Sequence, residues 1–258
     1  MSQQPYERLC LDVKEAHVTT RTHRTEQQTR ELVVASVLRQ IADHGVPVSA
    51  DLPMEQIIEA AGVSRASAYR IWRNRAEFQA FAIDQALAVH SSPTLGREEV
   101  VAIARRAVLP DDRDRRACAA RFIADSADAE LTIFTGSERW RAFVAVRALA
   151  MTSPDPGLRE RLAQIDTQDR DRLTGHYRTI AHALELQPID PEGVEHLAGS
   201  ALQLARGTLG HLAGDTADTH ALRTGYLTGL VALVRGTFAD AVGGAIDPDW
   251  GTTLTDRA

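Results

Sequence analysis

The segment from residue 60 to residue 78, AAGVSRASAYRIWRNRAEF, constrains the fold of this chain more than any other. Apolar residues at 54, 57, 58 and 61 have the i, i+3, i+4, i+7 spacing of one helical face. Gly62 can end that helix in a left-handed conformation, and Ser64 can cap the start of a second helix. Two short helices joined by a tight turn form a helix-turn-helix, whose second helix can enter a DNA major groove.

The second predicted helix and the residues after it carry charge of one sign. Four arginines and no Asp or Glu lie between residues 62 and 76. A run of one sign is typical of a segment that binds a polyanion, whereas the alternative is an ordinary helix junction in an all-α core. We therefore predict DNA contacts from eight residues: Ser64, Arg65, Ala66, Ser67, Tyr69, Arg70, Arg73 and Arg75.

These residues also resemble a known family. AAGVSR, followed three residues later by Tyr-Arg, is similar to the recognition segment of the TetR/AcrR transcriptional regulators. Ile71 and Trp72 stand where the family usually has His-Phe, Arg75 where it has Lys, and Ile58 where it has Ala. The resemblance implies that Tyr69 and Arg75 contact backbone phosphates. It also implies a homodimer that binds a palindromic operator, most often as a repressor, and responds to a small-molecule effector.

Positions within the predicted helices suggest finer roles. Arg65 and Ser67 lie just inside the second helix, and an arginine there can donate two hydrogen bonds to guanine. Asn74 is expected to cap the next helix, with Glu77 three residues further on. That helix N-terminus would favour a nearby phosphate.

Charge is unevenly divided along the chain. The formal net charge of the 258 residues is −6, which by itself argues against DNA binding. Residues 1–82, however, contain ten basic and ten acidic side chains, so the whole excess of acid lies beyond them. A neutral N-terminal module with one basic strip, attached to an acidic body, fits a protein that touches DNA at one end.

The rest of the chain predicts an all-α protein, since alternating β-branched runs bounded by turns are absent. Helices are expected near 26–43, 75–89, 97–107, 111–127, 137–151, 157–186, 191–213 and 219–243, separated by breaks that contain Pro or Gly. A break at residues 91–93 divides the chain into a flexible tail (1–24), a three-helix helix-turn-helix DNA-binding domain (25–90) and a helical ligand-binding and dimerisation domain (91–258).

The tail ends in basic residues whose role is open. Arg21, His23 and Arg24 precede the first helix and could enter an adjacent minor groove. The alternative is a solvated tail without DNA contacts.

Leucines and small residues form stripes on the last two predicted long helices. In the resembled family these helices pair with their copies in a second subunit. We therefore expect a homodimer interface, while packing of the stripes within one chain is the alternative. The interface residues are predicted to be Ala201, Leu204, Ala205, Thr208, Tyr226, Gly229 and Leu233.

An effector pocket has a weaker sequence signal. Aromatic and polar residues on two predicted helices of the body could line it, although each could equally be core or helix surface. The candidates are Trp140, Phe143, Arg147, His176 and Tyr177.

Other chemistry leaves no pattern in the sequence. The two cysteines, Cys10 and Cys118, are far apart, and the histidines lack metal-ligand spacing. No nucleotide-binding or nucleophile motif is present, so we expect no metal, no cofactor and no enzymatic activity. The apolar stretch 226–234 is too short to cross a bilayer, and no signal peptide is recognisable, so a cytoplasmic protein without a membrane partner is expected.

Two alternatives stay open. One is an all-α small-molecule-binding protein whose helix-turn-helix has lost DNA function, and the other is an all-α metal-dependent enzyme.

Overall fold

A computed structural model describes residues 24–47, 51–88, 95–212, 218–239 and 243–255. The described residues form eleven helices and no strand. In chain order these are α1 (Glu26–His44), α2 (Met54–Ala60), α3 (Arg65–Ile71), α4 (Arg75–Leu87), α5 (Arg97–Ala107), α6 (Arg115–Thr135), α7 (Glu138–Thr152), α8 (Pro156–Ala183), α9 (Gly193–Leu212), α10 (Thr219–Thr237) and α11 (Thr252–Thr255). The all-α class is confirmed, whereas residues 1–23 of the predicted tail 1–24 and the boundary at residues 90–91 lie outside the described residues.

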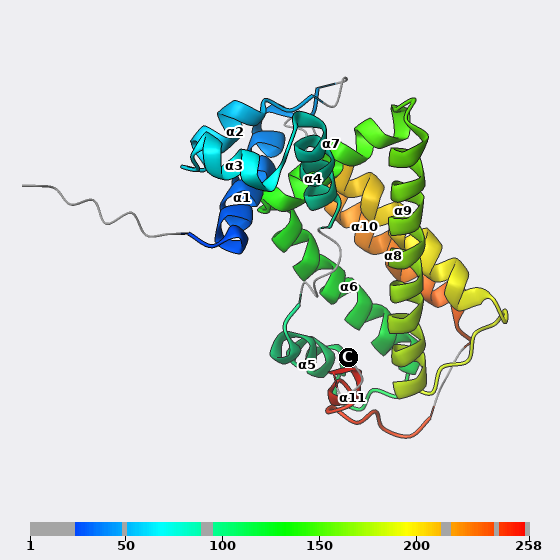
Figure 1. The fold of residues 1–258 in the computed structure, drawn as a ribbon. Helices are drawn as coiled ribbons and strands as arrows, with labels where there is room; N and C mark the ends of the chain where they lie inside the picture. The colour runs from blue at the N-terminus through cyan, green and yellow to red at the C-terminus, as the bar shows by residue number, and fades with distance from the viewer. Residues whose placement is uncertain (1–23, 48–50, 89–94, 213–217, 240–242, 256–258) are drawn as a thin grey trace, which may run out of the picture.

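Helices α1 to α4 form a small module at one end of the molecule, and the longer helices form the body (Figure 1). The core of the module centres on Val33, Val37, Ile57 and Phe78, none more than 1% exposed. Trp72 closes one side: its ring lies 5.5 Å edge-on from Phe78, measured between ring centroids. The residue that replaces the aromatic of the family pattern therefore packs as an interior side chain.

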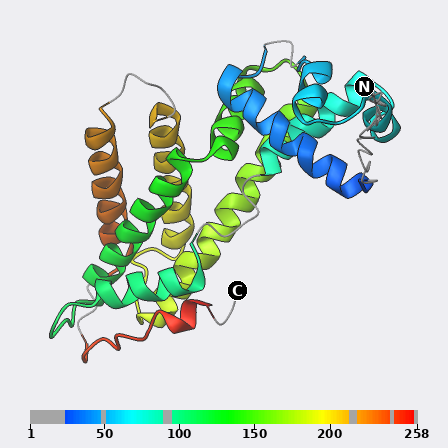
Figure 2. The ribbon, with the colours of Figure 1, turned by 90° about the vertical axis from the view of Figure 1, so that its left-hand side faces the viewer.

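The module packs on the body mainly through α7, and an ion pair between Asp84 of α4 and Arg161 of α8 adds a second link. Both α1 and α4 pack against α7, which in turn packs on α8 (Figure 1). Helix α6 packs on α10, α10 on α9, and α9 on α8. Seen from the side, α9 and α10 lie next to each other at the edge of the body farthest from the module (Figure 2). Movement in the body can therefore reach the module through α7.

Two predicted helices had wrong boundaries, because apolar periodicity identifies the buried face of a helix but not the residue at which the helix begins or ends. The helix expected at 111–127 begins at Arg115, where the Asp114 side chain accepts a hydrogen bond from Ala117 N, and continues to Thr135. The helix expected at 157–186 ends at Ala183, and Leu186 N donates to Ala181 O at 2.8 Å to close the turn. Glu185 occupies the left-handed position of that turn, with φ of 53°.

The last long helix is shorter than the 219–243 expected. It ends at Thr237, where the backbone turns to exchange hydrogen bonds with the α8–α9 connection: Ile189 N donates to Thr237 O, and Ala239 N to Gln187 O. The chain then returns beneath α5 and α6. Trp250 is buried there against Phe122, with ring centroids 5.0 Å apart. This return was not foreseen, because the sequence after residue 243 has no helical periodicity.

Candidate nucleic-acid interface

The α2–α3 turn is built as its sequence predicts. Gly62 has φ of 62°, a conformation that costs glycine little and other residues more. Gly62 N donates to Glu59 O and Val63 N to Ile58 O, the two hydrogen bonds of a Schellman turn. The Ser64 side chain then accepts a hydrogen bond from Ser67 N and caps α3. Both expectations, a terminating glycine and a serine cap, are confirmed.

The eight predicted contact residues lie on α3 and at the start of α4. Seven of them are exposed and Ser67 is half-buried, while Ala68 on the opposite side of α3 packs into the module core. Tyr69 is an exposed aromatic, with 44% of its surface accessible. The structure therefore gathers these side chains on one outward-facing surface of the module.

The N-terminus of α4 is capped as expected. The Asn74 side chain accepts a hydrogen bond from Glu77 N at 2.9 Å, and Glu77 Oε2 accepts one from Arg73 N at 2.9 Å. Arg73 and Arg75 stand exposed on either side of this cap. The start of α4 thus offers two cations beside the positive end of a helix dipole.

Two acidic residues approach this surface from outside the segment that sequence reasoning considered. Tyr69 Oη donates to Glu55 Oε1 at 2.8 Å, and Arg65 Nε lies 2.7 Å from Glu55 Oε2. The hydrogen bond to Glu55, followed by the carboxylate's charge, raises the pKa of Tyr69 and keeps it a donor. Similarly, Arg75 Nη2 lies 2.8 Å from Asp51 Oδ1.

These acids were missed because the charge count began at Gly62. Glu55 lies on α2 and Asp51 precedes it, so packing of α2 against α3 and α4 brings them to the surface. The signal available in the sequence was that Glu55 and Glu59 lie one turn apart on the polar side of α2, away from Ile57 and Ile58. This spacing indicates that an acid lies near the recognition segment, but it does not indicate which arginine the acid contacts.

Arg24 is the one member of the predicted basic arm within the described residues. Its Nη1 donates to Gly62 O at 2.7 Å, so in this structure it contacts the turn between α2 and α3. Arg21 and His23 lie outside the described residues.

The predicted pocket residues divide between interior and surface. Trp140 and Phe143 on α7 and Tyr177 on α8 are buried, and Trp140 stacks on Phe134 with ring centroids 4.6 Å apart. His176 is exposed. Burial raises the pKa of the Tyr177 hydroxyl, which stays protonated at neutral pH. The structure therefore places three of these candidates in the interior and one at the surface.

Arg147, the fifth pocket candidate, belongs to an ion-pair cluster that joins three helices. On α7 it makes two hydrogen bonds to Asp166 of α8, at 2.5 and 3.1 Å. Arg206 Nη2 of α9 lies 2.8 Å from Asp166 and 3.0 Å from Asp169. Asp169 and the Arg206 side chain are only 5% and 8% exposed, and burial raises the pKa of Asp169 and lowers that of Arg206.

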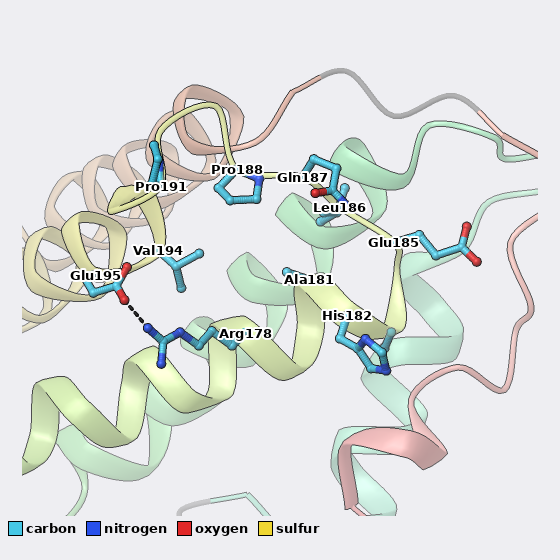
Figure 3. A pocket seen from close by; sticks show the side chains of 11 residues that line it. Arg178, Ala181, His182, Glu185, Leu186, Gln187, Pro188, Pro191, Val194 and Glu195 are labelled. Atoms are coloured by element: carbon cyan, nitrogen blue, oxygen red, sulfur yellow. Dashed lines mark hydrogen bonds and ion pairs between the residues drawn. The ribbon is translucent and has the colours of Figure 1, made fainter.

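A hollow of about 600 Å³ lies where α8 ends and the chain turns into α9 (Figure 3). Arg178 of α8 and Glu195 of α9 form an ion pair at its wall, and His182 and Glu185 lie farther along it (Figure 3). A second, shallow groove of about 630 Å³ runs along α9, lined by Gly199, Ser200, Gln203, Leu204, Gly207, Thr208, His211 and Leu222.

The predicted interface residues differ in their exposure. Ala201, Thr208 and Tyr226 are at most 9% exposed within a single protomer, so little of their surface is open to a second subunit. A Cβ on Gly229 would lie 3.2 Å from Leu204 Cδ1 of the same chain. The stripe mainly packs α9 on α10, and Leu204, Ala205 and Leu233 are half-buried beside it.

The solvent-exposed face of α9 and α10 lies beside the packed stripe on each helix. On α9 it carries Ser200, Gln203, Gly207 and Gly210, and on α10 it carries Thr224, Gly225, Thr228, Ala232 and Gly236, all exposed. A Cβ on any of these four glycines would meet nothing within 4 Å. We call this surface the outer α9–α10 face.

Within the part of the chain that the structure describes, neither a membrane-spanning helix nor a metal-ligand cluster is present. Among the described helices, none is long and apolar enough to cross a membrane. Within the same described ranges, no three His, Cys, Asp or Glu side chains group as a metal site requires.

No protein-family model matches the sequence, and no curated protein matches it significantly. Solved structures do match. A Rhodococcus sp. protein assigned to the TetR-family transcriptional regulators aligns over 80% of this chain and 98% of its own, with 18% identity and a TM-score of 0.51. The chain has the TetR fold. A TetR-family regulator from Streptomyces coelicolor covers 81% of this chain and 95% of its own (17% identity, TM-score 0.49). NalD, the secondary repressor of the MexAB-OprM multidrug efflux pump in Pseudomonas aeruginosa, covers 83% and 98% (15% identity, TM-score 0.49).

Proposed function

We propose that this TetR-fold protein is a sequence-specific DNA-binding transcriptional regulator that acts as a repressor. The observation that carries the proposal is the surface of α3 and the start of α4. There a short, capped helix presents Arg65, Arg70 and Tyr69 outward beside Arg73 and Arg75. Its dimensions and donors suit a major groove flanked by phosphates. The fold shared with a regulator supports the same function.

We further propose that the protein acts as a homodimer on a palindromic operator. One seven-residue recognition helix contacts only a few base pairs, which gives too little discrimination against genomic DNA. The outer α9–α10 face is the surface we assign to the second subunit. It is rich in small residues, and exposed Arg235 is the charged side chain on the same side of α10. Leu204 and Leu233, of the residues predicted from sequence, border it.

A small-molecule effector would act through the helical body. Helix α7 contacts α1 and α4 of the module, and Arg147 ties α7 to α8 by two hydrogen bonds. A ligand that shifts α8 or α9 would therefore change the orientation of the module through α7. The five pocket candidates, Arg147 among them, stay a prediction for where that ligand binds.

Selection of bound fragments from genomic DNA tests the proposal. The full-length protein should enrich fragments that share a palindrome, with half-sites about one helical turn or a small multiple apart. Fragments enriched without a shared sequence, or no fragments at all, would contradict a sequence-specific regulator and favour a body that binds small molecules alone.

Arg75→Ala tests the phosphate contact. We expect weaker binding on all DNA sequences alike and a salt dependence lower by about one unit of slope, because one cation–phosphate contact is lost. Arg159→Ala, which removes an exposed arginine of α8 in the body, is the control and should leave both quantities unchanged. Titration of fluorescent operator DNA at several salt concentrations measures the slope. Equal slopes for Arg75→Ala and the wild type would rule out this contact.

A further inference from the structure

Glu55 is an acidic residue on a surface that otherwise attracts DNA. It lies on α2, yet both oxygens of its carboxylate are engaged by α3: Oε1 accepts from Tyr69 Oη at 2.8 Å, and Oε2 lies 2.7 Å from Arg65 Nε. General affinity for a polyanion cannot explain it, because each carboxylate near phosphates weakens the attraction. Its position calls for a role in which a negative charge is useful.

The geometry of the Arg65 contact indicates that role. A guanidinium has five N–H donors in a rigid plane, and bidentate pairing with guanine O6 and N7 needs only two of them. The ion pair with Glu55 is formed at Nε, 2.7 Å from Oε2, so a guanine would be met by the terminal Nη1 and Nη2 groups. Arg65 is otherwise open to solvent, with 77% of its side chain exposed. Without a partner, such a long side chain samples many rotamers, and ordering it on binding costs free energy.

The Glu55 carboxylate, which contacts Arg65, is itself fixed in place by Tyr69. Tyr69 lies one helical turn after Arg65 on the same face of α3, and its hydroxyl fixes the second oxygen of Glu55. The Oε2 atom that meets Arg65 is shielded from solvent and accepts no hydrogen bond, so it contacts Arg65 as an ion pair. The three side chains therefore form a small unit, Arg65–Glu55–Tyr69, that links α2 to the first residue of the recognition helix and to the next turn along the same face.

We infer that Glu55 is a positioning residue for base reading. It holds the Arg65 guanidinium in one orientation, so that its free edge meets a guanine, and it neutralises the charge that would otherwise favour any phosphate. The inference rests on the proposed DNA-binding function and adds to it a specificity-determining residue outside the recognition helix. Loss of Glu55 is expected to lower sequence preference and, by removing one negative charge near the phosphates, to strengthen binding to random DNA slightly.

The test compares base preferences of full-length variants by selection from random DNA, followed by titration of the selected sites. Arg65→Ala should lose roughly tenfold preference at one base pair per half-site, within the range of a bidentate arginine–guanine pair. Glu55→Ala should lose preference at the same base pair. Arg65→Ala combined with Glu55→Ala should show no further loss, because both changes remove one interaction. Glu55→Gln should retain most of the preference, since its amide oxygen can accept from Arg65 and its NH₂ can donate to Tyr69.

Glu59→Ala is the matched control for charge. Glu59 is an exposed carboxylate on the same helix, so its removal changes the field near the DNA by the same amount as Glu55→Ala. It should strengthen binding to random DNA as much as Glu55→Ala does while leaving base preference unchanged. If Glu55→Ala fails to fold, Glu55→Met, which keeps the length of the side chain without an oxygen, should lose preference at the same base pair.

The outcomes separate this inference from the function on which it rests. A wild-type protein that selects no sequence would overturn both. A wild-type protein that selects an operator supports the function. If Arg65→Ala then loses preference at one base pair while Glu55→Ala keeps it, the role of Glu55 is overturned and the function stands. A switch of Glu55→Gln to a different preferred base would show that the carboxylate reads DNA directly, which also overturns positioning.

Discussion

Arginine in place of Gly207 is expected to give a folded monomer that binds its operator roughly 100-fold or more weakly, because the second recognition helix is no longer tethered to the first. Gly207 is exposed on the outer α9–α10 face and lines its groove. A Cβ there meets nothing within 4 Å, and arginine is a better helix former than glycine by about 1 kcal/mol, so the protomer itself should not lose stability. In a dimer, the same side chain would place unpaired charges in a dry interface.

Gly175→Arg is the matched control, since it makes the same change on the exposed side of α8, where a Cβ also meets nothing within 4 Å. Light scattering measures the mass of both variants, and titration measures operator affinity. A Gly207→Arg protein that stays dimeric with wild-type affinity would place the interface on another surface.

Gly229, which the sequence pattern offers as an equivalent position, is a poorer choice for this experiment. Its missing Cβ is what allows Leu204 of α9 to approach α10. The Cβ of an arginine at Gly229 would crowd Leu204 within one protomer, so an effect on the dimer and an effect on the packing of α9 on α10 would be confused.

Arg206→Met is expected to lower the free energy of unfolding by about 3–5 kcal/mol. The substitution keeps much of the side-chain volume but removes the guanidinium that contacts Asp166 and Asp169. Asp169, only 5% exposed, would lose its most buried counter-charge. Chemical denaturation of the full chain measures the change.

Arg178→Met is the control, because it breaks an ion pair between the same two helices in which Arg178 and Glu195 are 63% and 40% exposed. Water and salt screen such a pair, so the cost should not exceed about 1 kcal/mol. Replacing Arg206 and Asp169 together, by Met and Leu, should recover much of the stability, since no buried charge is then left unpaired. Equal costs for Arg206→Met and Arg178→Met would mean that the cluster is solvated in solution.

Much of the fold could be predicted because its signals are local. The termination of α2 at Gly62 and the caps at Ser64 and Asn74 each depend on a few neighbouring residues, and each was confirmed. Helix ends that depend on contacts distant in sequence were not predicted. Helix α10 stops at Thr237 because the α8–α9 connection pairs with the backbone there.

The candidate interface likewise combines features that the sequence predicts with contacts that only the packing of helices creates. A sequence read alone determined that a short basic helix follows a glycine turn and that eight side chains could face DNA. Tertiary structure decided that Glu55 and Asp51 would meet three of them, since α2 and α3 must pack before a carboxylate on one can reach an arginine on the other. It also decided which side of α9 and α10 is covered. Both sides carry small residues at helical spacing, and only the packing of one helix on the other distinguishes them.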